Sequence, residues 1–247
     1  MTNNATVFIV MIAAVTLLVS ISKGGLGGMA GTLSTPLLAL VMPVNQALGL
    51  LLPIMLLADV FSIAFHWKRW NGRLVWLLIP GAVVGVTIGT YFITNVSTQV
   101  LKIGLAVIAL LFVLYKLLEK RILGSVKYQE KNWHGWLAGT TAGFTSAMAH
   151  SGVPPISIYL ILHDVSPAVF VATSVLFYAI LNWVKVPYYY FTGMFDFPRL
   201  WQIAWVLPIV PFGVWLGRWL VIKVPKQVFE NIILALLVVT ALILIFG

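Results

Sequence analysis

Long apolar runs of helical length, separated by short polar segments, make up most of this chain. The runs cover residues 5–22, 33–42, 44–65, 74–93, 99–118, 134–149, 154–163, 166–191, 199–220 and 227–246. A helix of about 20 residues crosses the ~30 Å hydrocarbon core of a bilayer. Most of these runs have that length, and none shows the ten-residue alternation of an outer-membrane barrel. The pattern predicts an all-α polytopic membrane protein.

Two of the runs, 33–42 and 154–163, are too short to span a membrane. Ten helical residues rise about 15 Å, which is half of the hydrocarbon core. A glycine-rich stretch at 24–31 precedes the first, and a stretch at 149–155 with glycine and two prolines precedes the second. Broken helices at matching places in two halves of a membrane protein mark a transporter's binding site.

The chain divides into two halves with the same plan. The expected parts are an N-terminal repeat (1–118), a polar linker (119–132) and a C-terminal repeat (133–247) in one integrated transmembrane domain. Each repeat is a broken, re-entrant-like helical hairpin followed by three transmembrane helices. Equivalent residues recur at one constant offset, pairing Pro80 with Pro208, Gly85 with Gly213 and Gly89 with Gly217. Such an internal repeat constrains the fold more than any single motif.

Basic residues in short loops predict the orientation. Lys and Arg crowd the loop at 66–73, the linker and the segment 218–226, whereas the loops near 94–98 and 188–197 contain none. By the positive-inside rule the three basic segments are cytoplasmic. Three spans follow each hairpin, so the second half is inverted relative to the first. We expect a multi-pass protein of the inner (plasma) membrane with both termini on the outer, periplasmic side.

Composition narrows the classes of function. The chain is 61% hydrophobic and 9% charged, so its partners are the lipid bilayer and a small solute. Most of the basic residues behind the formal charge of +9 lie in short loops, where they act as orientation signals, so we expect no nucleic acid partner. Cysteine is absent, and neither a His/Glu metal motif nor a phosphate-binding loop is present, so we expect no metal, no cofactor and no catalytic residues. The oligomeric state stays open, a homo-oligomer included.

The starts of the two short helices form the candidate substrate site. Thr32, Ser34 or Thr35 can cap the first helix, and Ser151 can cap the second, with prolines just inside each. Free backbone N–H groups at a buried helix start need partners, and an anion supplies them. The two starts would converge from opposite sides. The backbone expected to line the site comes from Gly24, Gly25, Gly27, Gly28, Gly152 and Val153.

Ionisable residues inside the apolar runs extend the site. Lys23 borders the first break, His150 lies in the second, and Lys185 shares a helix face with Asn182 three residues earlier. All four are candidates for substrate binding, although a lysine can instead snorkel and a lone histidine can be structural. Asp59 and His150 are the candidates for coupling transport to protons. Glycines at 81, 85 and 89 and at 135, 139 and 143 favour close helix packing.

The ordered set of motifs resembles the TauE/SafE family, the sulfite exporter family also called TSUP. The residues that carry the likeness are 22–28, Leu52-Pro53 with Asp59, and 149–155 with Asn182 and Lys185. The resemblance implies an inner-membrane transporter of small sulfur-containing or organic anions, such as sulfite or sulfoacetate. We therefore expect a secondary transporter that works by alternating access. A passive anion channel is the alternative, and an intramembrane enzyme using Ser151 and His150 is disfavoured because adjacent side chains diverge.

Overall fold

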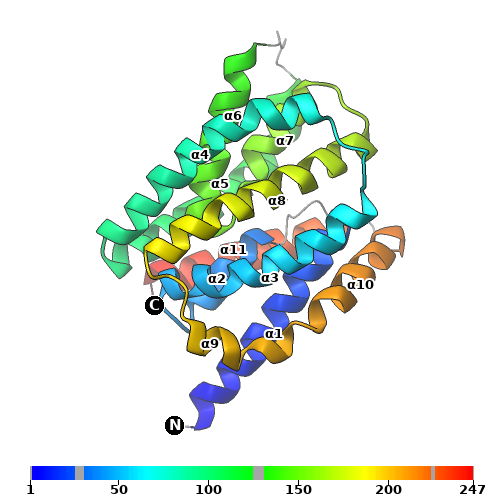
Figure 1. The fold of residues 1–247 in the computed structure, drawn as a ribbon. Coiled ribbons are helices and arrows are strands. Elements are labelled where there is room, and N and C mark those ends of the chain that lie inside the picture. Colours follow the sequence, from blue (N-terminus) through cyan, green and yellow to red (C-terminus); the bar gives the residue numbers. More distant parts are fainter. Residues whose placement is uncertain (1, 26–30, 125–130, 224–225, 247) are drawn as a thin grey trace.

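A computed structural model describes residues 2–25, 31–124, 131–223 and 226–246, and all regular structure in these ranges is helical. The helices are α1 (Thr2–Gly25), α2 (Gly31–Ala39), α3 (Val44–Phe65), α4 (Gly72–Asn95), α5 (Thr98–Gly124), α6 (Asn132–Ala149), α7 (Val153–Leu162), α8 (Pro167–Phe191), α9 (Phe197–Gln202), η1 (Ala204–Val206), α10 (Ile209–Lys223) and α11 (Lys226–Phe246). Figure 1 shows them as one bundle, with the short helices α2 and α7 among the long ones.

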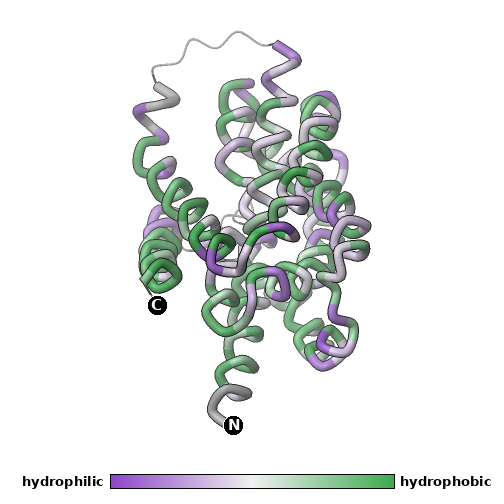
Figure 2. The backbone as a smooth tube through the Cα atoms, turned by 90° about the vertical axis from the view of Figure 1, so that its left-hand side faces the viewer, coloured by the Kyte–Doolittle hydropathy of each residue, from purple (hydrophilic) through white to green (hydrophobic). Residues whose placement is uncertain are grey.

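The long helices have the dimensions of membrane spans. Within the described ranges, five helices (α1, α3, α4, α5 and α8) are long and apolar enough to cross a bilayer. Shorter apolar stretches lie at Val153–Leu162, Ala204–Leu220 and Glu230–Phe246. Apolar colouring follows most of the backbone tube in Figure 2, as expected where side chains face lipid. The expectation of an all-α polytopic membrane protein is confirmed.

One predicted span is wrong in detail. The apolar run at 199–220 is divided into α9, η1 and α10. Pro208 has no N–H to donate, and the carbonyl of Ala204 accepts a 3.1 Å bond from Leu207 instead, so the chain tightens into a 3₁₀ turn. Asp196 caps α9 by accepting from the backbone N–H of Arg199 at 3.1 Å. The expected counterpart, Pro80, lies inside the unbroken α4.

Helices from different halves pack on one another. The main pairs are α4 with α6, α1 with α10, α5 with α11 and α3 with α8. In Figure 1, α3 and α8 run side by side through the middle of the molecule. The bundle therefore places the two halves in contact along its length, and the polar residues between α3 and α8 lie at their junction.

The predicted glycine stripes form the closest of these contacts. A Cβ atom added to Gly85 of α4 would stand 2.1 Å from the carbonyl oxygen of Thr140, and one added to Gly139 of α6 would stand 2.0 Å from that of Leu78. The two stripes thus pack against each other. Between α1 and α10, Gly24 and Gly217 make the same kind of contact. Small residues let the backbones of membrane helices approach this closely.

The two short helices are present as expected, with 9 residues in α2 and 10 in α7. Leu33 near the start of α2 belongs to the same buried apolar cluster as Met148, Ala149 and Val153 around the second break. The described residues after the first break and those around the second therefore lie in the interior of the bundle.

Candidate functional site

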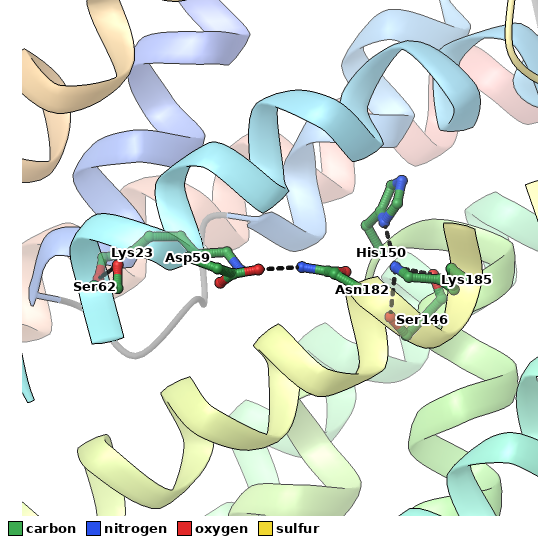
Figure 3. A network of polar contacts seen from close by, with 7 residues as sticks. All are labelled: Lys23, Asp59, Ser62, Ser146, His150, Asn182 and Lys185. Atoms are coloured by element: carbon green, nitrogen blue, oxygen red, sulfur yellow. Dashed lines mark hydrogen bonds and ion pairs between the residues drawn. The ribbon is translucent and has the colours of Figure 1, made fainter. Parts of the chain in front are cut away.

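A line of buried polar side chains connects α1, α3, α8 and the end of α6 (Figure 3). It runs from Lys23 through Asp59 to Asn182, and it resumes three residues further along α8 at Lys185, which contacts Ser146 and His150. Asp59 and Asn182 are 2% and 3% exposed and Lys185 is fully buried. Ionisable groups at such depth are costly in a membrane protein and usually functional.

Asp59 uses both carboxylate oxygens. Oδ1 pairs with the ammonium of Lys23, and Oδ2 accepts a 2.6 Å hydrogen bond from Nδ2 of Asn182. The Ser62 hydroxyl, one turn further along α3, donates to the backbone carbonyl of Lys23 at 2.9 Å. These bonds fix the end of α1 onto α3 and tie α3 to α8. The charges of Lys23 and Asp59 compensate each other.

The Lys185 ammonium is held differently. Its Nζ lies 3.1 Å from the Ser146 hydroxyl, 3.5 Å from the Ser146 carbonyl and 2.8 Å from Nδ1 of His150. When the ammonium donates, Nδ1 must accept, which assigns the imidazole proton to Nε2. That nitrogen lies 3.2 Å from the Leu48 carbonyl of α3, to which it donates. His150 is therefore neutral, and none of these partners carries a negative charge.

A left-handed residue shapes the second break. His150 follows α6 with φ 51°, and the Ser151 N–H turns back to the Thr145 carbonyl at 3.3 Å. Ser151 thus belongs to the end of α6, and Gly152 is the N-cap of α7, with no side-chain bond to the helix start. The expected Ser151 cap is wrong because the reversal at His150 takes up that residue. The expected proline in the first turn is present.

The first break is only partly described, because Gly27 and Gly28 lie outside the described residues. The helix α2 begins at Gly31, so Thr32, Ser34 and Thr35 lie inside its first turns and do not cap it. All three are buried, and the Ser34 hydroxyl donates to the Gly31 carbonyl. Within the described part of the chain the Thr35 hydroxyl oxygen has no hydrogen-bond partner. It is available to a ligand near the start of α2.

The remaining backbone candidates differ in their surroundings. Gly24 faces the Val214 carbonyl of α10 so closely that its role in the structure is helix packing. Gly25 ends α1. Gly152 and Val153 begin α7 beside the buried network, where a Cβ on Gly152 would stand 3.2 Å from the Ala142 carbonyl oxygen.

The structure joins Lys23, Asp59 and Asn182 in one chain of bonds and joins Lys185 with His150 in another. It links the hydroxyls of Ser34 and Thr35 to neither. Ser146 and Ser62 were missed by the sequence reasoning, although Ser146 lies one helical turn before His150 and Ser62 one turn after Asp59. Within the described ranges, no three metal-ligating side chains gather as they would around an ion.

Comparison with known proteins agrees with this picture. The model of the family described as "Sulfite exporter TauE/SafE" matches residues 12–244, nearly the whole chain. Searches of curated proteins and of solved structures found no match. The match covers both breaks and every residue of the buried network.

Proposed function

Because the chain belongs to the sulfite exporter TauE/SafE family, a family of membrane transporters, we propose that it carries a small sulfur-containing or organic anion by alternating access. Sulfite and sulfoacetate are the candidate substrates. The proposed site lies between α3 and α8, where α7 begins three residues after His150 of the buried network.

The observation that carries the proposal is the bonding of Lys185. This ammonium is fully buried, and within the described residues its partners are a hydroxyl, a carbonyl and a neutral imidazole. A buried charge is normally accompanied by a counter-charge. The nearby carboxylate of Asp59 is already paired with Lys23. We propose that Lys185 binds the anion in its protonated form, because the anion then supplies the counter-charge that these partners lack.

The helix starts support the same site. No side chain caps α7. Pro154 and Pro155 carry no N–H, so among the first three residues of the helix only Val153 can donate its backbone N–H to a bound anion, whose charge the helix dipole favours. The Thr35 hydroxyl offers a further donor from α2. Such pairs of short helices that end near the midplane are the form of site expected for a secondary transporter.

We also propose that the two halves are inverted repeats. In transporters built this way, alternating access comes from rocking of one repeat against the other. In this relation α1, α3, α4 and α5 of the first half correspond to α6, α8, α10 and α11 of the second. The contact of α4 with α6 then has its counterpart in the contact of α10 with α1, and the pairs α3–α8 and α5–α11 each join two equivalent helices. Asp59 and Asn182 occupy the same position along α3 and α8, counted from Val44 and Pro167, and they bond to each other. A contact between equivalent residues is expected on the axis.

The test is anion binding and flux with a matched pair of lysine variants. Lys185→Met removes the buried amino group and keeps an apolar stem, whereas Lys131→Met removes an exposed charge within the linker. Loss of a charge-assisted bond of about 1.5–3 kcal/mol predicts roughly ten- to hundredfold weaker binding for Lys185→Met alone. Thermal stabilisation by sulfite, thiosulfate, sulfoacetate and short carboxylates would measure the binding and identify the substrate. Near-wild-type binding by both folded variants would remove Lys185 from the site.

Flux into proteoliposomes separates the mechanisms. A transporter coupled through Asp59 or His150 accumulates the anion when a pH gradient is imposed, whereas a passive channel only equilibrates it. Coupling to protons stays a prediction, and unchanged flux with and without the gradient would contradict it.

A further inference from the structure

We propose that the Asp59 carboxylate is a tethered competitor of the transported anion, because it occupies the Lys23 ammonium that the anion would otherwise bind. The inference rests on the proposed anion transport and adds a role for Asp59 that concerns affinity rather than proton coupling. It assigns Lys23 as a second cationic contact that is closed while Asp59 is bound to it.

The two lysines of the network carry the argument. Both side chains are largely removed from solvent, with Lys23 at 10% side-chain exposure and Lys185 fully buried. Lys23 is bound by a carboxylate, whereas Lys185 is bound only by neutral groups. The network therefore contains one lysine that an anion of the protein already occupies and one that it does not.

The repeat accounts for this difference. Asp59 on α3 and Asn182 on α8 are equivalent in position, but only one of them is charged. Ser62 and Lys185 follow at equivalent places, three residues later. The carboxylate thus breaks the symmetry of the site, and it does so by placing an internal anion on the side of α1.

The chemistry of the competition is simple. A carboxylate and a sulfite or organic anion both accept hydrogen bonds from an ammonium, so they exclude each other from the same donors. A tethered group acts at a high effective concentration, and a free anion must overcome it. Asn182 also holds the second carboxylate oxygen at 2.6 Å, which keeps the competitor in place. The result is weaker anion binding, which allows the anion to be released again.

The test is the substitution Asp59→Asn in the full-length protein, with the sulfite Kd measured by titration in detergent micelles. The amide keeps the size of the side chain and an oxygen that can accept from Asn182, but it no longer neutralises Lys23. We expect sulfite to bind at least tenfold more tightly than to the wild type. A purely structural ion pair predicts the opposite, with unchanged or weaker binding.

A matched control removes a carboxylate from another membrane lysine. Glu119 pairs with Lys116 at 2.6 Å on α5, and Glu230 lies 3.6 Å from the same ammonium, so Glu119→Gln makes the same change of net charge away from the network while Lys116 keeps one carboxylate. We expect this variant to keep the wild-type Kd. An equal gain of affinity in Glu119→Gln would show that net charge alone is responsible and would overturn the proposal.

A second variant decides the question if Asp59→Asn does not fold. The double substitution Lys23→Met with Asp59→Met removes both charges, a change that buried ion pairs commonly tolerate. We expect it to fold and to bind sulfite at least tenfold more weakly than Asp59→Asn, and no more tightly than the wild type, because Lys23 is no longer present to be released. Tighter binding by the double variant than by the wild type would show that Asp59 opposes the anion by its charge rather than by occupying Lys23, and would overturn the proposal. If the wild type binds and transports no anion, the proposed function fails instead.

Discussion

Lys185 and Lys23 show two ways in which a membrane protein accommodates a lysine out of reach of water. The Lys23 ammonium is neutralised by a carboxylate on the neighbouring helix. The Lys185 ammonium is solvated by Ser146 and His150, which replace hydrogen bonds but not charge. Removing one partner of a buried pair leaves an uncompensated charge and is strongly destabilising. The second arrangement therefore suits a site whose counter-charge arrives with a ligand.

His66, which follows α3 at its end, gives a prediction about pH. Burial lowers the pKa of His66 below 6.5, and the positive charges of Arg69 and Arg218 lower it further. As the pH falls below about 6.5, the unfolded chain becomes protonated at His66 before the folded protein does. The free energy of unfolding therefore decreases as the pH is lowered. We expect His66→Gln to lose less thermal stability than the wild type between pH 7.5 and 5.5. The measurement is Tm at both values, and an equal loss would contradict the assignment.

At the scale of the helices, glycine decides how closely the elements pack. The α4–α6 and α1–α10 pairs both place glycine opposite a backbone carbonyl of the partner helix. Without an aqueous phase to drive apolar association, membrane helices rely on such close contact for van der Waals attraction. The same seams hold α1 and α6, the helices that lead into the two breaks, and so position the candidate site.

A pair of glycine variants tests the seams. The Gly85→Ala methyl would meet the Thr140 carbonyl oxygen at 2.1 Å, whereas the Gly104→Ala methyl would meet only Met148 Cε at 3.5 Å. Overpacking of this kind costs about 1–3 kcal/mol, so Tm of Gly85→Ala should fall by roughly 2–12 °C. Gly104→Ala should keep or raise Tm, because alanine favours helix by about 1 kcal/mol. Similar values for the two variants in detergent would contradict the packing.

At the scale of the whole molecule, the distribution of Lys and Arg predicts which loops face each side of the membrane. The chain has no cysteine, so single cysteines can be introduced and labelled to test this topology. We expect a membrane-impermeant maleimide to label Ser97→Cys and Thr192→Cys in intact cells, since both residues are exposed in loops without Lys or Arg. Arg69→Cys and Lys131→Cys should react only after the membrane is permeabilised. Labelling of all four variants from outside would contradict the orientation.

The sequence alone determined the class of the protein and most of its helices. Apolar length predicts spans because every backbone group in lipid must be bonded within its own segment. Two stretches of ten residues predicted α2 and α7 because no such length can cross a bilayer. The glycine stripes indicated close packing, because small residues let the backbones of membrane helices approach each other. The ionisable residues inside apolar runs indicated a site, because such residues are costly in lipid and therefore rare there.

Only the tertiary structure decided which residues meet. The sequence could not show that Asp59 reaches Lys23 and Asn182, or that Ser146 and His150 both solvate Lys185, because these contacts join helices far apart in the chain. It also assigned the cap of α7 to Ser151, whereas the left-handed turn at His150 gives it to Gly152. Local pattern specifies helices, but bonds between side chains depend on how the helices are rotated and packed against one another.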